Sequence, residues 1–210
     1  MYKRMNEQLQ KEGAMALVTG ASSGIGLAYA RELARRGYDL LLVSNEQERI
    51  GTVAEELAAA FGVKTIPLCM DLARSEAARE LYDYCEREKL QIGILVNNAG
   101  IFFFDDLTEV TPERIETMLL LHIRTVTLLC RYFGAAMKRR RAGYILNMSS
   151  LSAWTPAPGI SVYAASKSYI RKFSQMLRYE LHQYGVGVTT VCPGAIATGL
   201  YNLSDYYQRL

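Results

Sequence analysis

The sequence has 210 residues, of which 50% are hydrophobic and 21% are charged, and its formal net charge is +3. This size and composition suit one folded domain and exclude a disordered chain. So small a positive charge does not indicate a nucleic-acid partner. The apolar runs are too short for a membrane span, and residues 1–13 lack the apolar core of a secretion signal, so we expect a cytoplasmic protein.

Apolar strand patterns and amphipathic helix patterns alternate along the whole chain. The expected strands are 14–19, 39–44, 64–70, 92–97, 144–148 and 187–192. The expected helices run from the glycine loop to 36, and over 47–61, 75–89, 112–140 and 162–184. The strands are continuous apolar runs, which is typical of strands buried on both faces of a parallel sheet. We therefore predict a doubly wound α/β fold with helices on each side of the sheet, preceded by an N-terminal extension over 1–13.

A glycine loop, Thr19–Gly26 (TGASSGIG), joins the first expected strand to the first expected helix. Glycines at this place let a phosphate approach the main chain, and the helix N-terminus favours its negative charge. The spacing G-x-x-x-G-x-G lacks the Lys-Ser/Thr of an ATP-binding loop, so the loop predicts a dinucleotide site. The second strand ends at Ser44 and Asn45, neither of which is the usual ribose-binding acid, and we expect the next residue, Glu46, to face solvent.

Tyr163 and Lys167 are four residues apart, which places a phenol and an ammonium on one face of a helix. A nearby cation lowers the pKa of a tyrosine, so the phenol can exchange a proton with a substrate oxygen. Ser150 ends the fifth expected strand and can bind the same oxygen. A structural Tyr–Lys pair is the alternative, and the glycine loop and Ser150 argue against it.

Taken together, these motifs resemble the short-chain dehydrogenase/reductase family over about residues 14–200. The matching motifs are Thr19–Gly26, Asp71-Leu72, Asn97–Gly100 (NNAG), Asn147–Ser150 (NMSS), Tyr163–Lys167 (YAASK), and Pro193-Gly194 with Thr198. The resemblance implies a compact three-layer Rossmann domain over 14–210 with strand order 3-2-1-4-5-6. It also implies hydride transfer between NAD(P)(H) and a ketone, an aldehyde or a secondary alcohol.

The resemblance assigns a role to each matching residue. Tyr163 would be the catalytic acid/base, Lys167 would bind the nicotinamide ribose and lower the pKa of Tyr163, and Ser150 would orient the carbonyl. The residues that would contact the cofactor, besides Tyr163 and Lys167, are Gly20, Ser22, Ser23, Gly24, Ile25, Gly26, Asn45, Asp71, Leu72, Asn98, Ala99, Gly100, Pro193, Gly194, Ile196 and Thr198.

His122 departs from the family, which usually has an asparagine at this place in the helix before the fifth strand. That asparagine supports a water-linked proton path, so His122 is a further candidate catalytic residue, and structural packing of the ring is the alternative. Asn45 stands where relatives that prefer NADP often have arginine, and Ser44 where relatives that prefer NAD often have aspartate. Without the acid nothing repels a 2′-phosphate, so we expect NADP(H) over NAD(H), with Arg35, Arg36 and Arg49 as candidate phosphate partners.

The substrate is less well defined by the sequence than the cofactor. The apolar pocket-facing candidates favour a lipid-like, acyl or steroid-like carbonyl, and a sugar or small polyol is the alternative. Wide apolar faces on helices 112–140 and 162–185 favour a homodimer or homotetramer, although such faces also pack within a fold. The sequence ends at Leu210, shortly after the Pro-Gly motif, whereas relatives continue through a substrate lid, a helix and a final strand. We therefore expect that the sequence is incomplete, rather than that the protein lacks part of its substrate pocket.

Two other functions fit some of the motifs. A non-catalytic nucleotide-binding or regulatory protein has the same fold, and a sugar-nucleotide epimerase or dehydratase shares the Tyr–Lys pair but usually has a longer substrate domain. The basic run 138–141 suits a solvated helix end better than a nucleic-acid site. Four cysteines without paired spacing indicate neither a metal site nor a disulfide framework, and we expect buried, reduced thiols.

Overall fold

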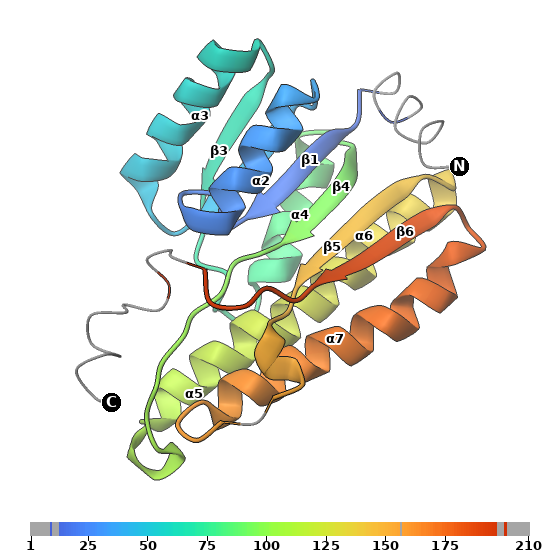
Figure 1. The fold of residues 1–210 in the computed structure, drawn as a ribbon. Helices are drawn as coiled ribbons and strands as arrows, with labels where there is room; N and C mark the ends of the chain where they lie inside the picture. The colour runs from blue at the N-terminus through green and yellow to red at the C-terminus, as the bar shows by residue number, and fades with distance from the viewer. Residues whose placement is uncertain (1–8, 10–12, 156, 197–199, 201–210) are drawn as a thin grey trace.

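The computed structural model describes residues 9, 13–155, 157–196 and 200. Within them, all strands lie in one parallel sheet with the order β3-β2-β1-β4-β5-β6, which confirms the predicted topology (Figure 1). The strands are β1 (Met15–Thr19), β2 (Leu40–Ser44), β3 (Thr65–Cys69), β4 (Ile92–Asn97), β5 (Gly143–Met148) and β6 (Val186–Val191). The helices are α2 (Gly24–Arg35), α3 (Gln47–Phe61), α4 (Ala77–Arg87), α5 (Pro112–Leu119), α6 (Val126–Arg140) and α7 (Ser161–His182).

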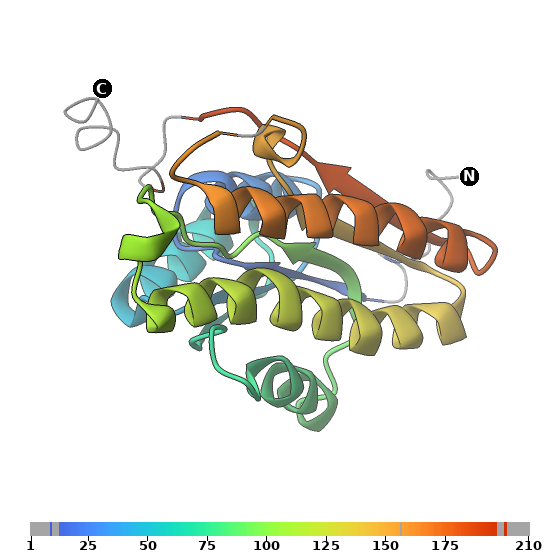
Figure 2. The ribbon, with the colours of Figure 1, turned by 90° about the horizontal axis from the view of Figure 1, so that it is seen from below.

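The sheet is covered on both faces, because successive residues of its central strands enter two different apolar cores. Leu17 and Leu41 belong to the core that contains residues of α4, α6 and α7. Val18 and Leu42 belong to the opposite core, with residues of α2 and α3. Figures 1 and 2 show the two layers, with α2 and α3 on one side and α4, α6 and α7 on the other. This two-sided burial is the physical reason for the continuous apolar runs.

The strand order reverses between β1 and β4, which places a crevice at their carboxyl ends. The segments that follow β1, β2, β4, β5 and β6 all contribute residues to this edge of the sheet. Every predicted functional motif follows the end of a strand or begins a helix at this edge. The fold therefore brings together segments that lie far apart in the sequence.

The expected helix over 112–140 is present without a break, but it is not α-helical throughout. A π-helical segment, η2 (Leu120–Thr125), separates α5 from α6. Pro112 begins α5 as predicted, with Thr111 in an extended conformation before it. Periodicity alone did not indicate the wider turn, which contains His122. Such π segments occur frequently at functional sites.

The expectation of buried thiols is only partly correct. Cys85 and Cys130 are buried, whereas Cys69 is exposed and Cys192 is half-buried. In the described sheet β3 is an edge strand that pairs only with β2, and residues 66 and 68 on one of its faces pack against the core. Cys69, on the other face, is left accessible.

Two further segments take part in the packing. Leu9, within the predicted N-terminal extension, is fully buried in the core on the α2 side. In the basic run 138–141, the ammonium of Lys138 lies 4.0 Å from the ring centroid of Tyr184, and the guanidinium of Arg140 donates to the Ile92 carbonyl at 2.6 Å. Both side chains thus have structural partners, in keeping with a helix end. Within the described part of the chain, no helix combines the length and apolar composition needed to cross a membrane.

Candidate active site

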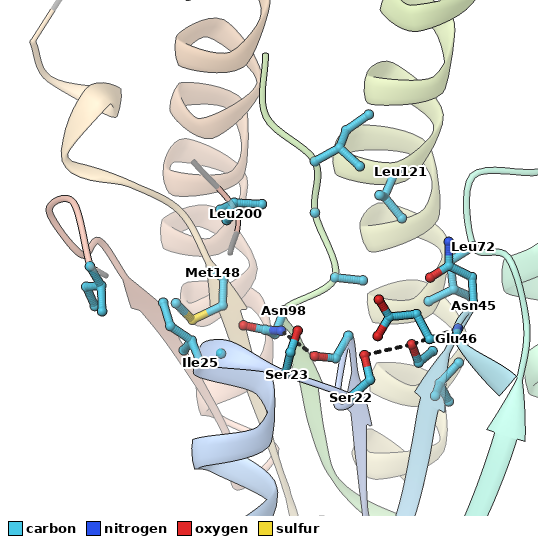
Figure 3. Close-up of a pocket in the computed structure, with 18 of the residues that line it drawn as sticks. Ser22, Ser23, Ile25, Asn45, Glu46, Leu72, Asn98, Leu121, Met148 and Leu200 are labelled. Carbon is cyan, nitrogen blue, oxygen red and sulfur yellow. Dashed lines mark hydrogen bonds between the residues drawn. The ribbon is translucent and has the colours of Figure 1, made fainter. Parts of the chain in front are cut away.

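A cavity of about 390 Å³ lies at the carboxyl ends of the strands (Figure 3). Its volume is in the range of small-molecule and cofactor pockets. Figure 3 shows Asn45 and Glu46 on one side of the cavity and Ile25 and Met148 on the other. The predicted residues that line it are Gly20, Ser22, Ser23, Gly24, Ile25, Asn45, Asp71, Leu72, Asn98, Ala99, Gly100, Tyr163, Lys167, Pro193, Gly194 and Ile196.

Three predicted residues, Gly26, Ser150 and His122, do not line this cavity, and Thr198 lies outside the described residues. Sequence reasoning missed several apolar lining residues and one serine. They are Val43, Met70, Ile101, Leu121, Met148, Ser149 and Leu200. Most of them are ordinary strand-end or helix residues, and only their position next to a motif distinguishes them.

The glycine loop forms a cradle that side chains would fill. Gly20 has φ +66°, a left-handed conformation that favours glycine. A Cβ on Gly26 would lie 2.0 Å from the Gly20 carbonyl oxygen and 2.5 Å from Nδ2 of Asn98. The N-terminus of α2 begins at Gly24 beside this turn. Free main-chain N–H groups and the helix dipole at such a turn fit the pyrophosphate of a dinucleotide.

Thr19 and Asn98 join the glycine loop to the NNAG segment after β4. The Thr19 hydroxyl accepts from the main-chain N–H groups of Asn98 and Ala99, each at 3.0 Å. In return, Nδ2 of Asn98 donates to the carbonyl oxygens of Thr19 at 3.0 Å and Gly20 at 3.2 Å. These bonds hold the two halves of the crevice at a fixed separation. They give Asn98 a structural role in addition to its place in the cavity wall.

The end of β2 forms one wall of the cavity. The Ser44 hydroxyl donates to the Ser22 hydroxyl at 3.0 Å and accepts from the Glu46 main-chain N–H at 3.2 Å. Glu46 is half exposed, as expected, but it also lines the cavity. Its carboxylate lies 3.8 Å from the guanidinium of Arg49, which lines the cavity as well.

Two of the three candidate phosphate partners are wrong. Arg35 and Arg36 lie at the C-terminal end of α2, and both pair with Glu32 at 2.7 Å. The glycine loop is at the other end of this helix. Only Arg49, in the first turn of α3, reaches the cavity.

Tyr163 and Lys167 occupy successive turns of α7 and are both buried, with 3% and 6% of their surface exposed. The Lys167 ammonium lies 5.5 Å from the centroid of the Tyr163 ring and donates to the Met148 carbonyl at 3.1 Å. Burial lowers the pKa of Lys167 to about 8. Ser150 is buried at the start of a short helix, η3 (Leu151–Ala153), and its hydroxyl accepts from the Ser152 main-chain N–H at 3.2 Å.

His122 lies in η2 with 1% of its surface exposed. Its ring packs edge to face against the Tyr163 ring, with 5.8 Å between the centroids. Nε2 lies 3.0 Å from the Ile101 main-chain nitrogen, and Nδ1 lies 2.9 Å from the Ser166 hydroxyl. Since neither ring nitrogen is directed into the cavity, the geometry does not support the predicted relay and favours the packing alternative.

The aromatic run 102–104 is explained by local packing. Phe102 packs edge to face against Tyr163, with 5.0 Å between the ring centroids. Phe103 is buried, and Phe104 lies against Gly159. The run itself does not line the cavity, although Ile101 before it does. Phe102 thus packs directly against the candidate catalytic tyrosine.

Comparison with known proteins agrees with this geometry. The model of the short chain dehydrogenase family matches residues 14–205. The chain belongs to this family. It is 37% identical over 199 residues to a very-long-chain 3-oxoacyl-CoA reductase from Anas platyrhynchos, with 91% of this chain and 62% of that protein covered. It is 32% identical over 206 residues to the inactive hydroxysteroid dehydrogenase-like protein 1 of Homo sapiens, covering 96% of this chain and 61% of that protein.

Among solved structures, a short-chain dehydrogenase from Sphingobium yanoikuyae in complex with NADPH is similar, with a TM-score of 0.86 and 34% identity. The similarity covers 91% of this chain and 75% of that one. A bulky-bulky ketone specific alcohol dehydrogenase from Comamonas testosteroni has a TM-score of 0.83 and 32% identity, covering 88% and 73%. The chain spans about 60% of the length of the curated relatives reported above.

Proposed function

We propose that the chain is an NAD(P)(H)-dependent oxidoreductase that interconverts a carbonyl and an alcohol. One observation carries the proposal: the buried pair of Tyr163 and Lys167 opens onto the same cavity as the glycine cradle. A cofactor bound by the cradle and a substrate oxygen at the phenol would therefore be neighbours. Membership of the short chain dehydrogenase family supports the proposal independently.

Each residue has a defined task in this reaction. The nicotinamide cofactor, when bound, donates or accepts the hydride. Tyr163 gives a proton to the alkoxide oxygen in the reducing direction and takes it back in the oxidising direction. The charge of Lys167 stabilises the phenolate that remains. Ser150 would orient the carbonyl once its hydroxyl turns from Ser152 toward the substrate.

We further propose that NADP(H) is preferred over NAD(H). The wall at the end of β2 has neutral Ser44 and Asn45 in place of an acid, and Arg49 supplies a guanidinium to the cavity. A guanidinium binds a phosphate through two parallel hydrogen bonds. Glu46 competes for this guanidinium at 3.8 Å, which would moderate the preference. Glu46→Gln is therefore expected to tighten NADPH binding, and Arg49→Gln to weaken it without changing the affinity for NADH.

The proposed substrate is an acyl, steroid-like or other bulky ketone. Ile196 and Leu200 line the cavity and remain 43% and 37% exposed, so the wall at this mouth is apolar. Similarity to a 3-oxoacyl-CoA reductase and to a bulky-ketone dehydrogenase points in the same direction. A sugar or polyol substrate would require polar partners on this wall.

The first test is a fluorescence titration with NADPH and with NADH, followed by NADPH oxidation with a 3-oxoacyl thioester and a steroid ketone. Tyr163→Phe should bind NADPH within about twofold of the wild type and lose about 10²–10⁴-fold in turnover, as expected for a lost general acid. Unchanged turnover in this variant would show that Tyr163 is not the general acid/base of the reaction. No binding of either nucleotide would refute the proposal altogether.

A non-catalytic nucleotide-binding role is the second candidate, because three relatives at 32–33% identity are named inactive. This candidate predicts saturable NADPH binding with no turnover of any carbonyl substrate. Ser150, Tyr163 and Lys167 are all present in this chain, which favours catalysis.

Homo-oligomerisation and the cytoplasmic location also stay predictions. The outer face of α7 supports a subunit contact, because Tyr169, Met176 and Tyr179 are exposed along it.

A further inference from the structure

The bonds of His122 allow one assignment of its protons. The Ile101 main-chain N–H is a donor only, so Nε2, at 3.0 Å, must be the acceptor. The single hydroxyl proton of Ser166 is donated to the Tyr163 carbonyl at 2.7 Å. The Ser166 oxygen is therefore left to accept from Nδ1–H at 2.9 Å. A neutral imidazole with its proton on Nδ1 satisfies every partner at once.

These consecutive hydrogen bonds connect three parts of the candidate active site. Ile101 belongs to the loop after β4 and lines the cavity. His122 belongs to the π segment, and Ser166 holds the carbonyl of Tyr163 within the catalytic helix α7. The ring also abuts Gly100, where a Cβ would lie 3.0 Å from Nε2. His122 thus fixes how far the loop after β4 stands from the first turn of α7.

The surroundings of the ring oppose a second proton. Burial and the charge of Lys167 lower the pKa of His122 well below its ordinary value. The groups that face the ring are the Tyr163 ring, the Ser166 hydroxyl and the Lys167 ammonium, and none of them is a carboxylate that would stabilise an imidazolium. A protonated imidazole would also lose the acceptor that the Ile101 N–H requires.

We propose that His122 is a positioning residue, which holds Tyr163 and the loop after β4 in place through one fixed ring tautomer and transfers no proton. The proposal rests on the proposed oxidoreductase function for its kinetic consequences. Its structural part, the tautomer, is independent of turnover. The π segment places the ring here by widening the helix at this turn.

Ring ¹⁵N chemical shifts test the tautomer directly, because the sequence has only two histidines, His122 and His182. His182→Gln assigns the signals. We expect His122 to show a protonated Nδ1 and an unprotonated Nε2, with no change between about pH 5 and pH 8, where an ordinary imidazole titrates. A proton on Nε2, or a shift that follows the pH over this range, would overturn the proposal even if the protein had no turnover.

Kinetics of two variants test the positioning role. A glutamine at 122 provides one acceptor and one donor but no titrating group. His122→Gln should therefore retain more turnover than His122→Leu, which we expect to lose about 10–100-fold in kcat through misplacement of Tyr163. The pH profile of kcat should keep its shape in both variants, and KM should change less than kcat.

His182→Gln is the matched control, and its kcat should equal that of the wild type. A changed pH profile in His122→Gln, with NADPH binding retained, would show proton transfer by His122 and refute the positioning role. Wild-type protein without turnover but with the expected ring shifts would refute the oxidoreductase function and leave the tautomer intact.

Discussion

Lys167 places a positive charge inside the protein, and that burial has a cost that depends on pH. Its pKa is about 8 in the folded chain and about 10.4 in an unfolded one. Below pH 8 the amine is charged in both states, so folding pays the full desolvation penalty. Between about pH 8 and 10.4 the unfolded chain binds more protons, and stability rises with pH.

Lys167→Met is therefore expected to raise the free energy of unfolding by up to about 3 kcal/mol at pH 7, because one pKa unit corresponds to 1.36 kcal/mol. The gain should fall toward zero near pH 10.5, and turnover should be lost. Urea denaturation at pH 7 and at about pH 10.5 measures this gain in the free energy of unfolding. Lys172→Met, on the exposed surface of α7, serves as the control with no such gain. A gain that did not depend on pH would assign the effect to packing.

Gly26 is the residue with the least space for a side chain in the glycine loop. Gly26→Ala would bring a Cβ to 2.0 Å from the Gly20 carbonyl oxygen. We expect a loss of about 1–3 kcal/mol in stability, as for overpacked sites, together with a loss of NADPH binding. Thermal unfolding and the fluorescence titration measure the two effects.

Gly51, within α3, is the control for this substitution, because a Cβ there meets no atom within 4 Å. Gly51→Ala should stabilise the protein by about 0.5–1 kcal/mol, since alanine favours the helix. If Gly26→Ala and Gly51→Ala changed the stability and NADPH binding equally, the glycine loop would be able to rearrange around the added methyl group.

At the scale of elements, a buried polar network joins the middle of the sheet to α6 and α7. Nδ2 of Asn97 in β4 donates to Oδ1 of Asn147 in β5 at 2.8 Å, and Nδ2 of Asn147 donates to the Ser174 hydroxyl at 2.9 Å. Cys130 in α6 lies against both asparagine amides at 3.4–3.6 Å. The network specifies the register of two strands and the approach of α7.

Asn147→Leu should cost about 2–4 kcal/mol in the free energy of unfolding, because Nδ2 of Asn97 and the Ser174 hydroxyl each lose a buried hydrogen bond and keep only Cys130 Sγ and the Ile170 carbonyl as partners. Urea denaturation measures the loss. Thr117→Ala removes an exposed hydroxyl that bonds to the Glu113 carbonyl, and it should change stability by less than about 0.5 kcal/mol. A neutral Asn147→Leu would mean that Asn97 and Ser174 find other partners.

Sequence patterns predicted the elements well where one physical cause dominates. The apolar runs of β1 and β2 follow from burial on both faces, and Gly62 ends α3 in a left-handed conformation. The π segment was missed because one wide turn barely disturbs the apolar spacing on either side of it. The contacts of His122 depend on that turn, so the sequence left its role open.

The misassigned arginines show a different limit. A helix rises about 1.5 Å per residue, so Arg35 stands about 16 Å from the start of α2. Helix geometry alone therefore separates it from the phosphate cradle. Arg49, in the first turn of α3, does line the cavity, and its role as a phosphate partner stays a prediction.

At the scale of the whole molecule, the outer face of α7 predicts an assembly. Tyr179 is 76% exposed and Met176 is 42% exposed on a helix of 22 residues. We expect a homodimer or homotetramer in sedimentation equilibrium, and Met176→Glu should weaken it by placing a charge in an apolar contact. A wild-type monomer would refute the assembly, and an unchanged variant dimer would place the contact elsewhere.

The cavity wall draws on the loops that follow β1 and β2 and on those that follow β4, β5 and β6. A nucleotide bound there would contact residues from both halves of the sheet, a surface that only the folded chain assembles. At a free concentration of 100 times the dissociation constant, such binding adds about 2.7 kcal/mol to stability. Resistance of the protein to proteolysis would then rise with the concentration of free nucleotide, because proteases cleave the unfolded chain.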